Sequence, residues 1–277
     1  MDYSQLARYG ASDFNFVEGK MTPDVPDTFQ PADLPCLGHI ENWDFDYITR
    51  FGGLRGQKVL CLGYSEADID RLVAPLEPSD IQILTLWKNH IDAVAGKYKV
   101  TLGDITKRTP FQDGEFDAVL SLSLLEHVAP LEDAFLEMRR ITRRGGSNFH
   151  MFGPAWSSAY GSHLYLSGSD GLTSFSKWEM PAFLHLLCSP RQIRNFYIAK
   201  GYETATADQV LEDMFSSPHI NRVFYDEYYR LMSKHFRVVN AELMTNDVPD
   251  NLLSALRKKF PWATDFSTYG GKYQLIR

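Results

Sequence analysis

The chain has 277 residues, of which 44% are hydrophobic, 13% aromatic and 23% charged. This balance is typical of a globular protein and excludes a disordered chain. The formal net charge of −7 gives no basic footprint, so nucleic acid is not an expected partner.

Nothing in the sequence points to a membrane or to a metal. The start, MDYSQLARYGASDFNF, lacks a basic segment followed by an apolar run, and no later stretch approaches the ~18 apolar residues of a membrane span. The cysteines are too few and too widely spaced for a disulfide framework, and His185 and Cys188 have no second pair of ligands beside them. We therefore expect a cytoplasmic protein without a membrane partner and without a bound metal.

The first 55 residues are predicted to form an N-terminal arm or cap. Segment 21–35 holds four prolines and no periodic apolar pattern, which favours irregular chain, while aromatic residues around it give the arm something to bury.

From Gln57 the pattern alternates between strand and helix. Leu131, Phe135, Met138 and Ile141 recur at helical spacing, and we expect Gly145 and Gly146 to stop that helix. Strands are predicted at 58–63, 81–87, 99–105, 116–123 and 147–153, a helix at 66–76, and a helix or loop at 88–98. This alternation predicts a doubly wound parallel sheet, whose ligands bind at the carboxyl ends of its strands.

After Gly153 the rhythm changes. Residues 154–235 are rich in aromatic residues, with helices expected near 190–200 and 220–233, and strands return at 236–244 and 272–277. We predict a core over 56–153, a substrate lid inserted over 154–235, and the last two core strands over 236–277.

The stretch from Gly103 to Gly146 carries the most specific motifs. It reads GDITKRTPFQDGEFDAVLSLSLLEHV and, a few residues on, LEDAFLEMRRITRRGG. This pattern resembles the class I S-adenosylmethionine-dependent methyltransferases of the small-molecule, type 11-like group. The family has an acidic residue after the third strand, a PF-x-DG-x-FD turn, a LEHV word and a GG turn. The resemblance spans about residues 56–155 and implies a Rossmann-like, mostly parallel, seven-stranded sheet.

The resemblance also implies S-adenosylmethionine as cofactor. Asp104 would accept a hydrogen bond from the adenine amine, although its position alone fits a carboxylate that caps a turn equally well. The positions expected to contact the cofactor are Gly63, Tyr64, Thr85, Asp104, Ile105 and Ser121.

The glycine motif departs from the family pattern. In CLGYSEA, residues 61–67, one glycine is kept where the family has three, and Thr85 stands where an acid would hold the ribose. One hypothesis is that the cofactor is held through Asp104, backbone groups and unusual partners such as Trp87. The other is a catalytically inactive, methyltransferase-like binding protein. A dinucleotide-dependent oxidoreductase is a weaker third, because G-x-G-x-x-G is missing.

Two histidines are candidates for a base that deprotonates a hydroxyl acceptor. His163 follows the fifth strand and His127 belongs to the LEHV word, whereas His150 is expected to be buried within a strand. Trp156 and Tyr160 offer rings for a small or saccharide-like acceptor. The alternative is that these two rings pack within the lid and that His163 makes a structural hydrogen bond.

The remaining patterns favour ordinary structure. Arg139–Arg140 and Arg143–Arg144 are expected on solvated faces. Phe224, Tyr228 and Leu231 share one helical face, which would serve as core or as the surface of a homodimer.

Overall fold

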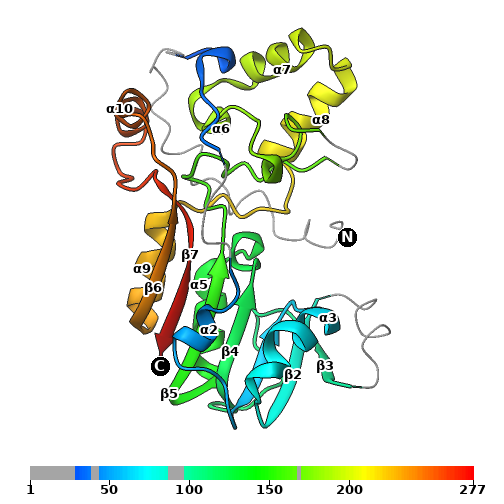
Figure 1. Ribbon diagram of the computed structural model, residues 1–277, viewed down its shortest axis with the longest axis vertical. Helices are drawn as coiled ribbons and strands as arrows, with labels where there is room; N and C mark the ends of the chain where they lie inside the picture. Colours follow the sequence, from blue (N-terminus) through cyan, green and yellow to red (C-terminus); the bar gives the residue numbers. More distant parts are fainter. Residues whose placement is uncertain (1–28, 39–43, 87–96, 167–169) are drawn as a thin grey trace. The chain divides into compact units, whose positions relative to one another are not determined.

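The computed structural model describes residues 29–38, 44–86, 97–166 and 170–277, which belong to two compact units (Figure 1). The sheet unit comprises Asn42–Gly153, Tyr228–Leu243 and Gly271–Arg277, and the helical unit comprises Met1–Glu41, Pro154–Glu227 and Met244–Gly270. Most of the predicted arm, the predicted segment 88–98 apart from its last two residues, and Trp87 lie outside the described residues.

Seven strands form one sheet in the order β3-β2-β1-β4-β5-β7-β6. They are β1 Lys58–Leu62, β2 Asp80–Thr85, β3 Lys99–Leu102, β4 Phe116–Leu122, β5 Thr142–Phe152, β6 Arg237–Thr245 and β7 Thr268–Ile276. The first five pair in parallel, whereas β7 pairs with β5 in antiparallel fashion. The predicted Rossmann-like α/β class with a mostly parallel, seven-stranded sheet is therefore confirmed.

The central strands are apolar because both of their faces are covered. Leu60 in β1 and Val119 in β4 have no exposed surface, as expected for central strands of a parallel sheet. Because the first five strands run parallel, their carboxyl ends lie along one edge of the sheet.

Helices α5 and α9 cover the same face of β5. The Phe135 ring of α5 lies 6.2 Å from the His150 ring, and the Tyr228 ring of α9 stacks 4.4 Å from that of Phe152. Residues 150 and 152 point to one side because side chains alternate along a strand. The helices of this part of the chain are α2 Tyr47–Arg50, α3 Glu66–Asp68, α5 Leu131–Ile141 and α9 Tyr225–His235.

The fifth strand begins earlier than predicted. The preceding helix ends at Ile141, and the strand runs from Thr142 through both glycines, so the expectation that Gly145 and Gly146 stop the helix is wrong. A Cβ at Gly146 would lie 2.7 Å from the carbonyl oxygen of Asp117. Glycine is therefore needed there for close strand approach.

The core of the helical unit contains a cluster of aromatic rings. Phe224, Phe260, Trp262 and Phe266 form one cluster, in which the Phe224 and Trp262 centroids are 4.5 Å apart. Its helices are α6 Leu184–Leu187, α7 Pro190–Ala199, α8 Thr204–Phe215 and α10 Asp250–Lys259. The predicted lid at 154–235 shares most of its residues with this unit, and its role as a lid stays a prediction.

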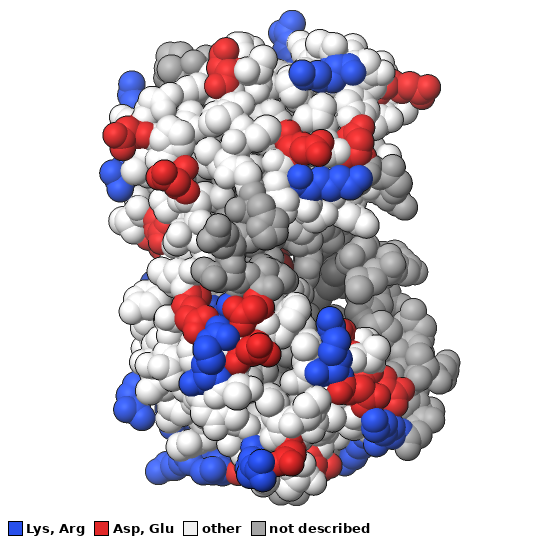
Figure 2. All heavy atoms as spheres, in the orientation of Figure 1, with Lys and Arg blue, Asp and Glu red and all other residues white. Residues whose placement is uncertain are grey.

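Charges of both signs are interspersed on the face drawn in Figure 2, without a large patch of one sign. None of the helices within the described ranges combines the length and the apolar character needed to cross a bilayer.

Candidate functional site

The loop after β1 makes a tight turn at Gly63. Its φ of +70° lies in the left-handed region that favours glycine, and its N–H donates to the carbonyl of Leu84 in β2 at 3.1 Å. A Cβ at this position would lie 3.2 Å from Cδ1 of Leu124. The turn therefore places the end of β1 against the segment that follows β4.

The residues that follow Gly63 in CLGYSEA have structural roles of their own. Tyr64 is buried with Tyr47 nearby, and burial raises the pKa of its hydroxyl well above the usual value. Ser65 caps α3, because its Oγ accepts a hydrogen bond from the N–H of Asp68 at 3.1 Å. The departures in CLGYSEA thus build the turn and begin the next helix.

Asp104 lies just after β3 and uses one carboxylate oxygen in a turn. Its Oδ1 accepts hydrogen bonds from the N–H and the hydroxyl of Thr106, both at 2.8 Å. Its Oδ2 accepts none from the residues that the structure describes, and the neighbouring Ile105 side chain is buried. Asp104 therefore does cap the turn, as the alternative predicted, and its Oδ2 remains able to accept a hydrogen bond from a ligand.

Thr85 and Ser121 are buried at the ends of their strands. The carbonyl of Thr85 accepts the N–H of Gly103 at 2.9 Å, which ties the end of β2 to the turn before Asp104. The Ser121 hydroxyl lies 2.7 Å from Nδ1 of His150, its register partner on β5. Burial lowers the pKa of His150 to about 3, so this imidazole is neutral and the expectation that it is buried is confirmed.

Glu126 is a further residue at this edge and was not among the candidates predicted from sequence. It lies in the short 3-10 helix Leu125–His127, has no exposed surface, and neither of its carboxyl oxygens has a hydrogen-bond partner within the described part of the chain. The backbone N–H groups of Glu126 and Gly153 favour the charged form without reaching normal hydrogen-bond geometry. Burial outweighs them and raises the pKa of Glu126 to about 8.

His127 follows Glu126 on the same turn and is half-buried. One of its ring nitrogens lies within 4.8 Å of a Glu126 carboxylate oxygen. The structure thus brings Gly63, Leu124, Glu126 and His127 to the carboxyl ends of β1 and β4.

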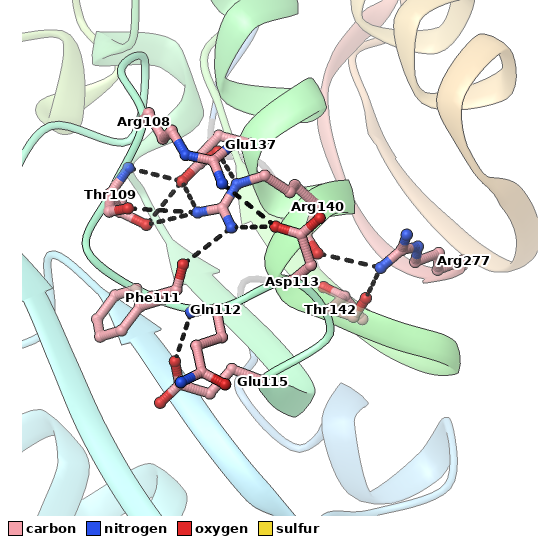
Figure 3. Close-up of polar contacts among 10 residues, drawn as sticks. All are labelled: Arg108, Thr109, Phe111, Gln112, Asp113, Glu115, Glu137, Arg140, Thr142 and Arg277. Carbon is pink, nitrogen blue, oxygen red and sulfur yellow. Dashed lines mark hydrogen bonds and ion pairs between the residues drawn. The ribbon is translucent and has the colours of Figure 1, made fainter.

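The PF-x-DG-x-FD turn is fixed at the opposite end of β4 by Arg140 (Figure 3). The Arg140 guanidinium donates to both oxygens of Glu137 at 2.6 and 2.7 Å and to the carbonyl of Phe111 at 2.9 Å. Glu137 also accepts the N–H of Thr109 at 2.7 Å and its hydroxyl at 2.6 Å. Because the Arg140 side chain is 13% exposed, its expected place on a solvated face is wrong.

The other candidates lie in the helical unit, and two of them are buried. Trp156 packs edge-on against His185, with centroids 4.5 Å apart, and the Tyr160 hydroxyl accepts the N–H of Leu37 at 2.9 Å. His163 is half-buried, and its ring lies 4.1 Å from that of Phe175. These contacts are those expected of packing residues, and the roles of Trp156 and Tyr160 in substrate binding and of His163 as a base stay predictions.

Residues 57–149 match the model of the methyltransferase domain family. The match covers about a third of the chain, and these residues are similar to a methyltransferase domain. The match covers β1 through most of β5, and thus the strand ends described above.

The chain is similar to several solved structures at low sequence identity. An S-adenosylmethionine-dependent methyltransferase from Mesorhizobium loti has a TM-score of 0.50 at 14% identity, over 85% of this chain and 99% of that one. The YcgJ protein from Bacillus subtilis gives 0.49 at 11% identity, over 84% and 97%. An S-adenosylmethionine-dependent methyltransferase from Archaeoglobus fulgidus gives 0.46 at 16%, over 83% and 90%. No curated protein matches the chain significantly.

The residues at the strand ends fit the family's cofactor. The turn after β1 has no side chain at Gly63, Oδ2 of Asp104 has no hydrogen-bond partner among the described residues, and Glu126 supplies an unpaired buried carboxyl. When bound, S-adenosylmethionine would supply a methyl group on a positively charged sulfur.

Proposed function

We propose that the protein is an S-adenosylmethionine-dependent O-methyltransferase that acts on a small or saccharide-like acceptor. Cofactor binding is supported by one observation. Gly63, Asp104 and Glu126 lie at the carboxyl edge of the sheet, where ligands of doubly wound folds bind. Gly63 and Tyr64 would line the methionine and ribose, Thr85 the ribose, and Asp104 and Ile105 the adenine. Ser121 would support the strand end near the methyl group.

The acceptor part is supported by chemistry. Methylation of a hydroxyl requires a group that takes up its proton, and a histidine suits this role near neutral pH. His127 is the candidate in the sheet unit, and His163 is the candidate in the helical unit, where Trp156 and Tyr160 offer rings for a polyol.

The first experiment is calorimetry with S-adenosylmethionine and S-adenosylhomocysteine. We expect both to bind and to raise the melting temperature, because a ligand that binds only the folded state stabilises it. Folded protein that binds neither compound at concentrations far above typical cofactor levels would contradict the proposal and favour the inactive binding protein.

The acceptor class requires a second experiment. Radiolabelled methyl transfer would be measured against monosaccharides and matched amino sugars, and mass spectrometry would locate the methyl group. We expect label on hydroxyl oxygen. Label only on the amines would refute O-methylation while leaving the cofactor assignment intact.

A further inference from the structure

Glu126 is a buried carboxyl that no hydrogen bond or cation among the described residues stabilises. Native proteins pair nearly all buried polar groups, so an exception calls for an explanation such as a catalytic or binding role. Both oxygens of Glu126 lack a partner among the described residues, although the side chain has no exposed surface. By contrast, Glu137 in the same unit is bound by Arg140 and Thr109.

The place of Glu126 links it to the cofactor edge. Leu124, two residues earlier, lies against the Gly63 turn after β1, and Glu126 itself lies close to the backbone N–H of Gly153 after β5. The segment therefore connects the carboxyl ends of β1, β4 and β5, where the proposed cofactor binds.

Few charges face this carboxyl from the surrounding elements. Within the sheet unit, the titratable groups nearby are His127 on its own turn, His150 in β5, and Tyr228 in α9, whose hydroxyl donates to the carbonyl of Leu125 at 3.3 Å. His150 is neutral because burial lowers its pKa to about 3. The basic residues nearby are exposed to solvent. They are Arg143 and Arg144 in β5 and Arg230 and Lys234 in α9.

We propose that Glu126 is protonated in the free protein and ionises when the sulfonium of S-adenosylmethionine occupies the strand ends, releasing its proton to solvent. This inference rests on the proposed function. A positive charge nearby favours the carboxylate, and the carboxylate in turn stabilises a cation that has left water. S-adenosylhomocysteine is neutral at this sulfur and gives no reason for the proton to leave. Glu126 would thereby favour the methyl donor over the product.

The test measures proton release on binding. Wild-type protein is titrated at pH 7 with S-adenosylmethionine and with S-adenosylhomocysteine, each in phosphate and in Tris, whose ionisation enthalpies differ. We expect close to one more proton to be released with the methyl donor than with the product. The affinity for the donor should rise by up to about tenfold per pH unit between pH 6 and 8, while the affinity for the product stays nearly constant.

Two variants complete the test. Glu126→Gln should abolish the difference in proton release and reduce the preference for the donor by about tenfold at pH 8. Glu132→Gln is the matched control, because Glu132 is partly exposed on α5 and the hydrogen bonds of Lys234 and His235 lower its pKa, so the proton difference should persist.

The outcomes separate the two proposals. If neither compound binds, the proposed function fails. If both bind to wild-type protein and release equal numbers of protons, the role of Glu126 is refuted, and this result does not depend on whether Glu126→Gln folds.

Discussion

Glu137 is buried beside the turn that leads into β4 and has an arginine and a threonine as partners, whereas Glu126 is buried just after β4 with no described partner. As a result, the pKa of Glu126 is raised and that of Glu137 is lowered. Burial raises the pKa of Glu137 as well, but Arg140 and Thr109 outweigh it and lower the pKa below the usual value. Burial alone therefore does not decide the charge of a carboxyl. A satisfied carboxyl stabilises the fold, and an unsatisfied one is a candidate for function.

The largest effect is expected from Arg140→Met. The change leaves the buried Glu137 carboxylate without its cation, which costs about 3–5 kcal/mol when a buried pair is broken. Urea unfolding at pH 7 measures it. Arg139→Met, an exposed neighbour on the same helix, should cost less than about 1 kcal/mol. Equal losses in the two variants would show that the network around Glu137 does not stabilise the fold.

A smaller effect of opposite sign is expected from Glu126→Gln in the absence of ligand. Between the ordinary carboxyl pKa and about 8, folded wild-type protein holds a proton on Glu126 that the unfolded chain has lost. Wild-type stability therefore falls as pH rises through this window, by up to about 1.4 kcal/mol per pH unit. Glutamine carries no such proton, so the variant should be more stable than wild type by a few kcal/mol at pH 8.

Urea unfolding at pH 4 and at pH 8 checks this prediction. At pH 4 the carboxyl is protonated in the folded state and largely so in the unfolded chain, and the two proteins should differ little. His150 acts in the other direction at acid pH in both proteins, so its contribution cancels in the difference. A stability difference that does not change with pH would mean that Glu126 is already ionised in the free protein.

The sequence predicted the sheet well because its central strands are continuous apolar runs. The sequence-based prediction failed where contacts between residues distant in sequence determine the local structure. In the sequence, Gly145 and Gly146 are equally compatible with the end of a helix and with a strand. Only the close approach of the Asp117 carbonyl to Gly146 shows why a glycine is needed in the strand. Arg140 looked solvated because its partners lie three residues away on α5 and across a loop.

The site was predicted less completely for a similar reason. Trp156 and Tyr160 are aromatic whether they hold a substrate or pack within the chain, and composition does not separate the two cases. Glu126 was overlooked beside the histidine of the LEHV word. The one sequence feature that accompanies its burial is its place among the apolar residues Leu124, Leu125 and Val128. Helix α8 was also not predicted, although its buried residues Ala207, Val210 and Met214 recur at helical spacing.

The smallest effect is expected from Asp104→Asn, which separates the two roles of this side chain. Asparagine keeps a carbonyl oxygen that can accept both hydrogen bonds from Thr106, so the turn and the melting temperature should be nearly unchanged. The second oxygen becomes an amide NH2, which donates and no longer accepts from the adenine amine. Losing one charge-assisted hydrogen bond should weaken S-adenosylmethionine binding roughly tenfold in calorimetry. Asp104→Ala should weaken binding similarly and also destabilise the turn by about 1 kcal/mol. If Asp104→Asn binds the cofactor as wild type does, Asp104 is a turn residue only, and adenine must be held by other groups.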